Sequence, residues 1–320
     1  MLPLLLLLAS AHGALGLVAK ASSSKEAPPG VITTPRARAS QNVVDRSSAE
    51  GKCWTKQQAG ESSWTNSSFL TKPRLFSEQH GRLAKVYYIN LNTSTARRES
   101  MERQLKASGV PYERFPAVNA KDVKSGKFGA ILNRTGLDPE LGADPASVGG
   151  TIGCALSHRL LYEKILKEDP GSMNAYMVME DDAVLPPGWV DRINRLLPQV
   201  PADAVVVNAG SFGRIRCEDV VSEELALATW PFRVGYDYFY SGSAGLLLFP
   251  ATLPALVDAL HGQPLHHADV AILSKGAVRT YNTLEHLVEL DWNLASQRTS
   301  EDGRGELALS SRWSATSGRC

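Results

Sequence analysis

The feature that most constrains the fold is a strand, a helix and a second strand that follow one another within residues 85–115. Lys85–Leu91 is rich in β-branched and aromatic residues, which is typical of a buried strand. A helical segment is expected at Ala96–Ser108, ended by Gly109, and the next strand at Tyr112–Phe115. This order predicts a parallel sheet with a crossover helix, and therefore an α/β fold.

The later segments extend this layered pattern. Thr151–Lys167 is predicted to be a helix with apolar side chains on two sides, which indicates burial between layers. Helical stretches are expected after Gly188, Thr252 and Ala268. Further core strands are predicted at Ala175–Met179, Ala204–Asn208 and Gly245–Phe249.

The chain divides into four predicted segments. Residues 1–19 resemble a signal peptide, because the leucine run precedes Ala9-Ser10-Ala11, a small-residue cleavage site. A signal anchor, or a leader without a targeting role, is the alternative, and no other stretch is a candidate transmembrane helix. Residues 20–80 are expected to form a flexible polar stem, 81–300 a single folded domain and 301–320 a loose tail.

Composition narrows the partners and the compartment. The 34 basic and 33 acidic residues give a formal net charge of +1, so we expect no nucleic-acid partner. Three glycosylation triplets, at Asn66, Asn92 and Asn133, are compatible with a lumenal protein. The four cysteines allow three full pairings in an oxidising compartment, and none has zinc-motif spacing. They are Cys53, Cys154, Cys217 and Cys320.

Three consecutive carboxylates, Glu180, Asp181 and Asp182, stand where an apolar strand is predicted to end. Open parallel sheets bind ligands at the carboxyl ends of their strands. If the extended conformation persists, Glu180 and Asp182 point to the same side and Asp181 points away. Two carboxylates on one side can hold a divalent cation, which can in turn bind a diphosphate. The alternative is a solvated acidic turn.

Arg97 and Arg98 fall in the first turn of the helix that follows the first strand. Cations oppose the helix dipole there, and a bound phosphate would reverse the sign of that interaction. The alternative is that both side chains lie in solvent.

His158 lies on an otherwise apolar stripe of its helix, where it is either a satisfied core histidine or a ligand-facing one.

Two further groups are weaker candidates. The first group is His266, His267 and Asp269, in which a histidine could serve as a metal ligand and the aspartate as a base. The alternative is a polar loop that enters a helix, with Asp269 near the helix start. Alternating tyrosines could stack on sugar rings or simply pack. These are Tyr236, Tyr238 and Tyr240.

Several of these motifs together resemble glycosyltransferase family 25, the group of lipopolysaccharide-type and procollagen galactosyltransferases. Thr151-Ile-Gly-Cys-Ala-Leu-Ser-His158 resembles the family's G-E-I-G-C-x-x-S-H helix, and Met179-Glu-Asp-Asp182 its E-D-D element. Upstream, the matching segments are Tyr88–Leu91 with Arg97-Arg98, Gly109–Tyr112 and Ala117–Asn119. The resemblance covers about Lys85 to Leu273.

The resemblance implies a GT-A-like nucleotide-binding α/β sandwich with a mostly parallel central sheet and one catalytic domain. It implies inverting, metal-assisted transfer of a hexose, galactose or glucose, from a UDP-sugar to a hydroxyl on a protein or glycan, with Mn²⁺ or another divalent cation. Glu180 and Asp182 would be the metal ligands, and Asp182, Asp269 and His158 the catalytic residues. The donor site would comprise Asn90, Arg97, Arg98, Ser157, Glu180 and Asp181.

The sequence also departs from the family pattern. Thr151 stands where the family usually has Glu, and residues 208–239 show little resemblance. A single domain, where animal collagen-modifying enzymes carry two, means that a collagen substrate is not implied. We expect an enzyme of the endoplasmic reticulum or Golgi lumen. The alternatives are a catalytically silent relative that binds glycans or proteins, and a metal-dependent phosphohydrolase.

Overall fold

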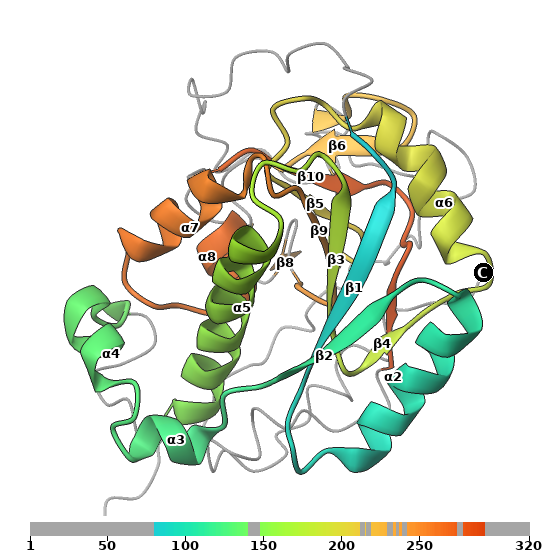
Figure 1. Cartoon of the computed structure of the whole chain (residues 1–320). Coiled ribbons are helices and arrows are strands. Elements are labelled where there is room, and N and C mark those ends of the chain that lie inside the picture. The colour runs from blue at the N-terminus through green and yellow to red at the C-terminus, as the bar shows by residue number, and fades with distance from the viewer. Residues whose placement is uncertain are drawn as a thin grey trace, which may run out of the picture. The chain divides into compact units, whose positions relative to one another are not determined.

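A seven-stranded sheet forms the centre of the described part of the chain (Figure 1). Its strand order is β2-β1-β3-β9-β5-β10-β6. In that order the strands are Tyr112–Pro116, Leu83–Asn90, Ala175–Glu180, Gly245–Leu248, Val206–Asn208, Thr280–Thr283 and Leu225–Leu227. β9 and β6 run antiparallel to their neighbours, and the other five strands share one direction. The predicted α/β fold with a mostly parallel central sheet and a single domain is therefore confirmed.

The computed structural model describes residues 80–139, 148–211, 215, 219–228, 233–234, 237–238, 242–273 and 278–291. All of these residues belong to one unit, residues 42–320. The predicted signal peptide, most of the predicted stem and the C-terminal tail lie outside them. Within these ranges no helix combines the length and the apolar character needed to cross a bilayer.

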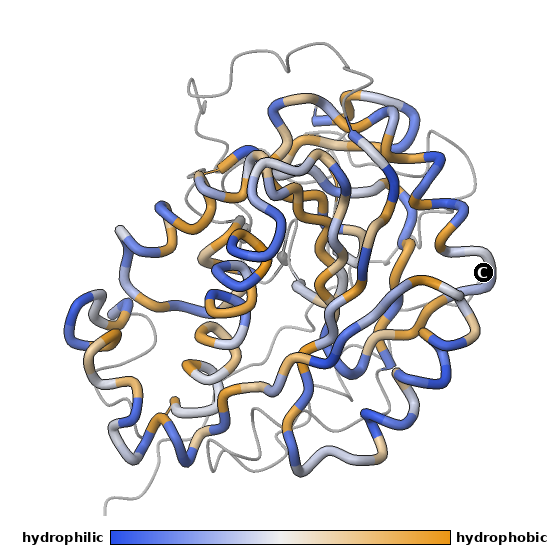
Figure 2. The backbone as a smooth tube through the Cα atoms, viewed as in Figure 1, coloured by the Kyte–Doolittle hydropathy of each residue, from blue (hydrophilic) through white to orange (hydrophobic). Residues whose placement is uncertain are grey.

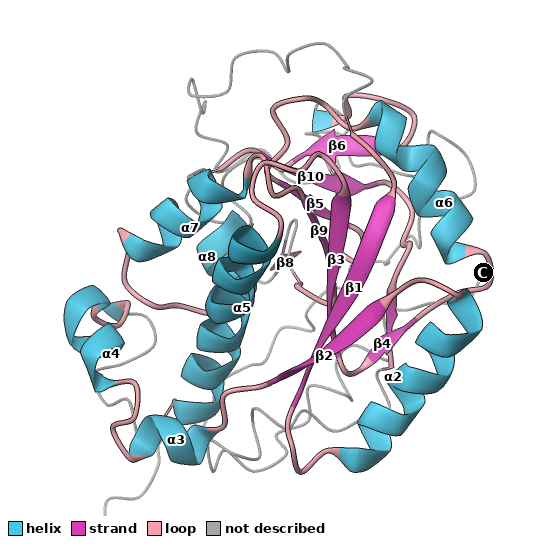
Figure 3. Cartoon of the chain, viewed as in Figure 1, coloured by secondary structure: helices cyan, strands magenta, loops and turns pink. Residues whose placement is uncertain are grey.

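Helices cover both faces of the sheet (Figure 3). On one face pack α2 (Thr95–Ser108) and α6 (Trp189–Leu196), and on the other α5 (Gly149–Glu168), α7 (Leu253–His261) and α8 (Ala268–Leu273). The remaining elements are α3 (Ala120–Lys124), α4 (Gly129–Thr135), the 3₁₀ turn Leu197–Gln199 and the short strand pairs β4–β11 (Ala183–Val184, Glu289–Leu290) and β7–β8 (Arg233–Val234, Asp237–Tyr238).

The alternation of side chains along β1 explains the two-sided core. Val86 and Tyr88 pack with α2 and α6, whereas Tyr87 and Ile89 pack with α5. Apolar residues accordingly run down the centre of the sheet in Figure 2. A strand that is buried on both faces reads as a continuous apolar run, which is why this segment was identifiable from the sequence.

Helix α5 is buried on two sides, as its pattern predicts. Leu161 and Ile165 pack toward the sheet, and Ile152 and Leu156 pack against the segment that carries α3. Gly153 permits the close approach on that second side, because a Cβ atom there would lie 2.4 Å from the carbonyl oxygen of Val118.

Replacement of Gly153 by alanine should therefore destabilise the protein. Because the added Cβ atom would meet a backbone oxygen, the overpacking cost should lie in the upper part of its usual range, at about 2–3 kcal/mol, and so exceed the helix-propensity gain of about 1 kcal/mol from Gly to Ala. We expect a net loss of about 1–2 kcal/mol in the free energy of unfolding, measured by urea denaturation. Gly129→Ala on α4 is the control, since a Cβ atom added there would meet no neighbouring atom within 4 Å. An unchanged stability in Gly153→Ala would contradict the close packing.

Candidate functional site

Polar side chains gather at the edge of the sheet where its parallel strands end. Asn90 ends β1, Glu180 ends β3 and Asn208 ends β5, and these three strands point in the same direction. Ser243 lies just before the antiparallel strand β9, which begins at this edge. This is the edge at which open α/β sheets bind their ligands.

The three carboxylates do not alternate as a continued strand would require. A turn begins at Asp181, directly after β3. Arg97 Nη1 donates to both Asp181 Oδ1, at 2.7 Å, and Asp182 Oδ2, at 3.3 Å. Glu180 instead faces His158 and accepts a hydrogen bond from the Ser243 hydroxyl. The expectation that Asp181 points away from Asp182 is therefore wrong, because the backbone turns where the sheet ends.

Asp181 is held by two donors from the β1–α2 segment. Asn90 Nδ2 donates to Asp181 Oδ2 at 2.7 Å and to the carbonyl oxygen of Ser94 at 3.1 Å. Arg114 Nε in turn donates to Asn90 Oδ1 at 3.0 Å. With only 10% of its side chain exposed, Asp181 depends on these donors and on Arg97 for the stability of its charge.

Asp182 has one carboxylate oxygen in a different situation. Its Oδ1 is buried and has no hydrogen-bond partner in the part of the chain that the structure describes. Burial, and next the negative charge of Glu180, raise the pKa of Asp182 to about 7, although Arg97 acts in the opposite direction. A buried carboxylate oxygen without a donor is an atom that a cation could satisfy.

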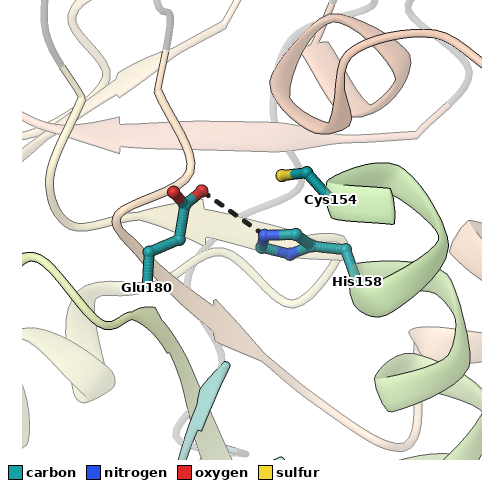
Figure 4. A group of neighbouring side chains, drawn as sticks. All are labelled: Cys154, His158 and Glu180. Atoms are coloured by element: carbon teal, nitrogen blue, oxygen red, sulfur yellow. Dashed lines mark ion pairs between the residues drawn. The ribbon is translucent and has the colours of Figure 1, made fainter. Parts of the chain in front are cut away.

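Glu180 closes a second group, formed with Cys154 and His158 of α5. One ligand atom from each residue lies within 4.8 Å of the others. Figure 4 shows Cys154 and His158 one turn apart on the helix, both directed toward Glu180. His158 Nε2 lies 3.4 Å from Glu180 Oε1, and His158 Nδ1 lies 2.9 Å from the Tyr162 hydroxyl.

The other predicted site residues are placed as follows. Ser157 donates to the carbonyl oxygen of Gly153 and accepts from the amide of Val118, so its hydroxyl joins α5 to the neighbouring segment. Arg98 is half-buried on α2. Asp269 Oδ2 accepts from the amide of Gly242 at 3.1 Å, next to the serine that contacts Glu180.

Four residues of this site are not predicted from the sequence as functional residues. Ser243 and Gly242 follow the segment without a recognisable pattern, and no local signal marks them. Asn208 Nδ2 donates to the carbonyl oxygen of Gly242 at 2.7 Å, which fixes this segment against β5. For Cys154 the sequence predicts only a place on an apolar stripe. Its position four residues before His158 is the signal that could have identified it.

The weaker candidates remain apart from this group or lie outside the described residues. His266 is buried, and its Nδ1 accepts from the amide of His267. Tyr238 belongs to β8, while Tyr236 and Tyr240 lie outside the described ranges. Asn92 and Asn133 are exposed, and Asn66 lies outside the description. Of the four cysteines, Cys154 lies within the described residues, and the other three lie outside them.

His158 also lines a small cavity. It has a volume of about 20 Å³ and lies between α5, α7 and α8, with Arg159, Tyr162 and His266 among its lining residues. That volume holds about one water molecule, so the cavity cannot accommodate a nucleotide. The buried Arg159 guanidinium donates toward Glu163 through Nε, and burial lowers its pKa.

Comparison with known proteins bears on this site. Residues 83–229 match the family model described as glycosyltransferase family 25 (LPS biosynthesis protein). A protein of Acanthamoeba polyphaga mimivirus, named as a candidate glycosyltransferase, is 25% identical over 64% of this chain and 61% of its own length. "Glycosyltransferase 25 family member" proteins of Drosophila melanogaster and Anopheles gambiae are each 28% identical, over 50% and 57% of this chain and 26% and 29% of their own lengths. The chain thus spans less than two thirds of the length of these relatives.

Two neighbouring arginines provide a test of the carboxylate network. Arg97→Ala leaves Asp181 and Asp182 without their shared cation, so we expect a loss of about 3 kcal/mol in unfolding free energy. Arg98→Ala is the matched control and should cost less than about 1 kcal/mol. Urea denaturation of both variants measures the difference. Equal losses would mean that the start of α2, rather than the ion pairs of Arg97, is what the substitution disturbs.

Proposed function

We propose, on the premise that residues 83–229 belong to glycosyltransferase family 25, that this chain is an inverting hexosyltransferase. It would move galactose or glucose from a UDP-sugar to a hydroxyl group on a protein or glycan, with galactose as the first choice. The observation that carries the proposal is the carboxylate cluster at the carboxyl edge of the sheet, with Asp182 Oδ1 buried and without a donor among the described residues.

Glu180 and Asp182 would hold Mn²⁺ or another divalent cation. Their side chains are 30% and 24% exposed, so neither is sealed from the surface. The charge of Glu180 also contributes to the raised pKa of Asp182, which is consistent with two carboxylates sharing one site. The cation, when bound, neutralises the negative charge that develops on the departing nucleoside diphosphate.

The remaining residues would bind and orient the donor. Arg97 and Asn90 keep Asp181 in a fixed position, from which it can accept hydrogen bonds from the nucleotide. Arg98, the second arginine in the first turn of α2, would bind phosphate oxygens of the donor. Ser157 would support the donor site indirectly, by anchoring α5. His158 would act next to the reacting atoms through its contact with Glu180.

Asp269 is the proposed base. The acceptor oxygen would attack the anomeric carbon while the bond from that carbon to the diphosphate oxygen breaks. The acceptor proton would pass to the Asp269 carboxylate. The hydrogen bond from Gly242 to Asp269 Oδ2, beside the Ser243–Glu180 contact, supports a position near the reacting atoms.

The proposed location is the lumen of the endoplasmic reticulum or Golgi. The signal-like leader and the exposed positions of Asn92 and Asn133 support it. The alternative function is a catalytically silent relative that binds glycans or proteins. Thr151, in place of the family's usual Glu, favours that alternative, and the intact Glu180–Asp182 cluster opposes it.

Calorimetric titration of UDP tests the nucleotide and metal part of the proposal. We expect UDP to bind in the presence of Mn²⁺ and not with chelator, and Asp182→Asn to weaken binding at least tenfold because it removes a charged ligand. Asp258→Asn, the same substitution at an exposed position on α7, is the control and should bind UDP like the wild-type protein. Binding that ignores both Mn²⁺ and Asp182 would contradict the assignment.

A panel of nucleotide sugars with Mn²⁺ tests the reaction itself. We expect slow release of UDP from UDP-galactose or UDP-glucose without acceptor. Asp269→Asn should lower transfer to an acceptor by about 100-fold or more, the usual contribution of a general base, while UDP affinity stays unchanged. Release of inorganic phosphate would indicate a phosphohydrolase. Binding of UDP without any turnover of a nucleotide sugar would indicate the catalytically silent relative.

A further inference from the structure

The geometry points to a zinc site formed by Cys154, His158 and Glu180, which shares Glu180 with the proposed donor cation and does not include Asp182. It is a thiolate, imidazole and carboxylate set with one position open for water. The set joins the first half of α5 to the end of β3. The inference rests on these three side chains alone and does not require the proposed transferase activity.

The spacing of the ligand atoms fits tetrahedral coordination. Ligands at about 2.0–2.3 Å from a tetrahedral zinc ion lie about 3.3–3.8 Å from one another. His158 Nε2 and Glu180 Oε1 are 3.4 Å apart, within that range, and all three ligand atoms lie within 4.8 Å. Sulfur–nitrogen and sulfur–oxygen pairs lie near the middle of that range, at about 3.5 Å, so Cys154 has to approach by about 1.3 Å at most, which a change in one side-chain torsion angle can provide.

The environment of His158 favours a role as a metal ligand over a role in core packing alone. Its side chain is only 2% exposed, and Nε2 is buried without a hydrogen-bond partner among the described residues. Nδ1 meets the Tyr162 hydroxyl at 2.9 Å. If Nδ1–H donates to that oxygen, Nε2 presents its lone pair to Cys154 and Glu180. A second ring nitrogen fixed by a hydrogen bond is typical of metal-ligating histidines.

Glu180 has a comparable support. The Ser243 hydroxyl donates to Oε1 and orients the carboxylate toward α5. On α5 itself, the spacing of four residues places Cys154 and His158 on the same face of the helix (Figure 4). All three ligands therefore belong to regular elements or their ends, which hold them in place before a metal binds.

The chemistry of the donor set selects zinc over manganese. Thiolate and imidazole are soft and borderline ligands that bind Zn²⁺ and Co²⁺ more tightly than Mn²⁺, which prefers oxygen. On binding, the Cys154 thiol releases its proton to solvent as the metal–sulfur bond forms, without oxidation or reduction. The carboxylates Asp181 and Asp182 lie outside the set and remain with Arg97.

Cobalt substitution of the metal-stripped full-length protein tests the site. We expect Co²⁺, added without nucleotide, to give a near-ultraviolet sulfur-to-cobalt band and intense tetrahedral visible bands, both removed by added Zn²⁺. Cys154→Ser should abolish the sulfur band, and His158→Gln should weaken Zn²⁺ affinity by about 100-fold or more. His261→Gln, which changes an imidazole on α7, is the matched control and should leave the spectrum unchanged.

A second comparison separates this site from the donor cation. Asp182→Asn should keep the cobalt–thiolate band, although it is expected to impair Mn²⁺-dependent UDP binding. Absence of the band in the unchanged protein, or its persistence in Cys154→Ser, would overturn the zinc site and leave the transferase proposal untouched. A band lost equally in His261→Gln would reveal adventitious binding, which also overturns it.

Discussion

The neutralisation of three adjacent carboxylates at the end of a buried strand is the constraint on which the site depends. Arg97 and Asn90 satisfy Asp181, and Ser243 and His158 meet Glu180. Asp182 is only partly compensated, so its carboxyl pKa is raised and one oxygen has no donor in the described structure. Concentrated negative charge of this kind is costly in a folded protein unless cations or donors converge on it.

Helix α5 connects this cluster to the rest of the domain. Gly153 lets the helix approach Val118, and Ser157 hydrogen-bonds across the same contact. These contacts fix the helix, and the helix fixes Cys154 and His158 opposite Glu180. A rigid framework that carries several reactive side chains to one strand end allows binding geometry to be set before any ligand arrives.

The main secondary-structure elements were predictable because their signals are local. The apolar run of β1, the helix that Gly109 ends and the two-sided apolar pattern of α5 each depend on neighbouring residues only. The antiparallel insertion of β9 between β3 and β5 was not predictable, because strand direction is decided by pairing partners distant in sequence. β10 and β6 are too short, at four and three residues, to produce a periodic pattern.

The sequence by itself determined the α/β class, the acidic strand end and the family resemblance, since these follow from patterns and motifs along the chain. Only the tertiary structure decided how the carboxylates are divided between Arg97 and His158, because that division depends on where the backbone turns after Glu180. It also brought Cys154 and His158 to Glu180. Zinc-motif spacing in the sequence did not reveal that group, because its third member comes from another element and meets the pair only through packing of α5 on the sheet.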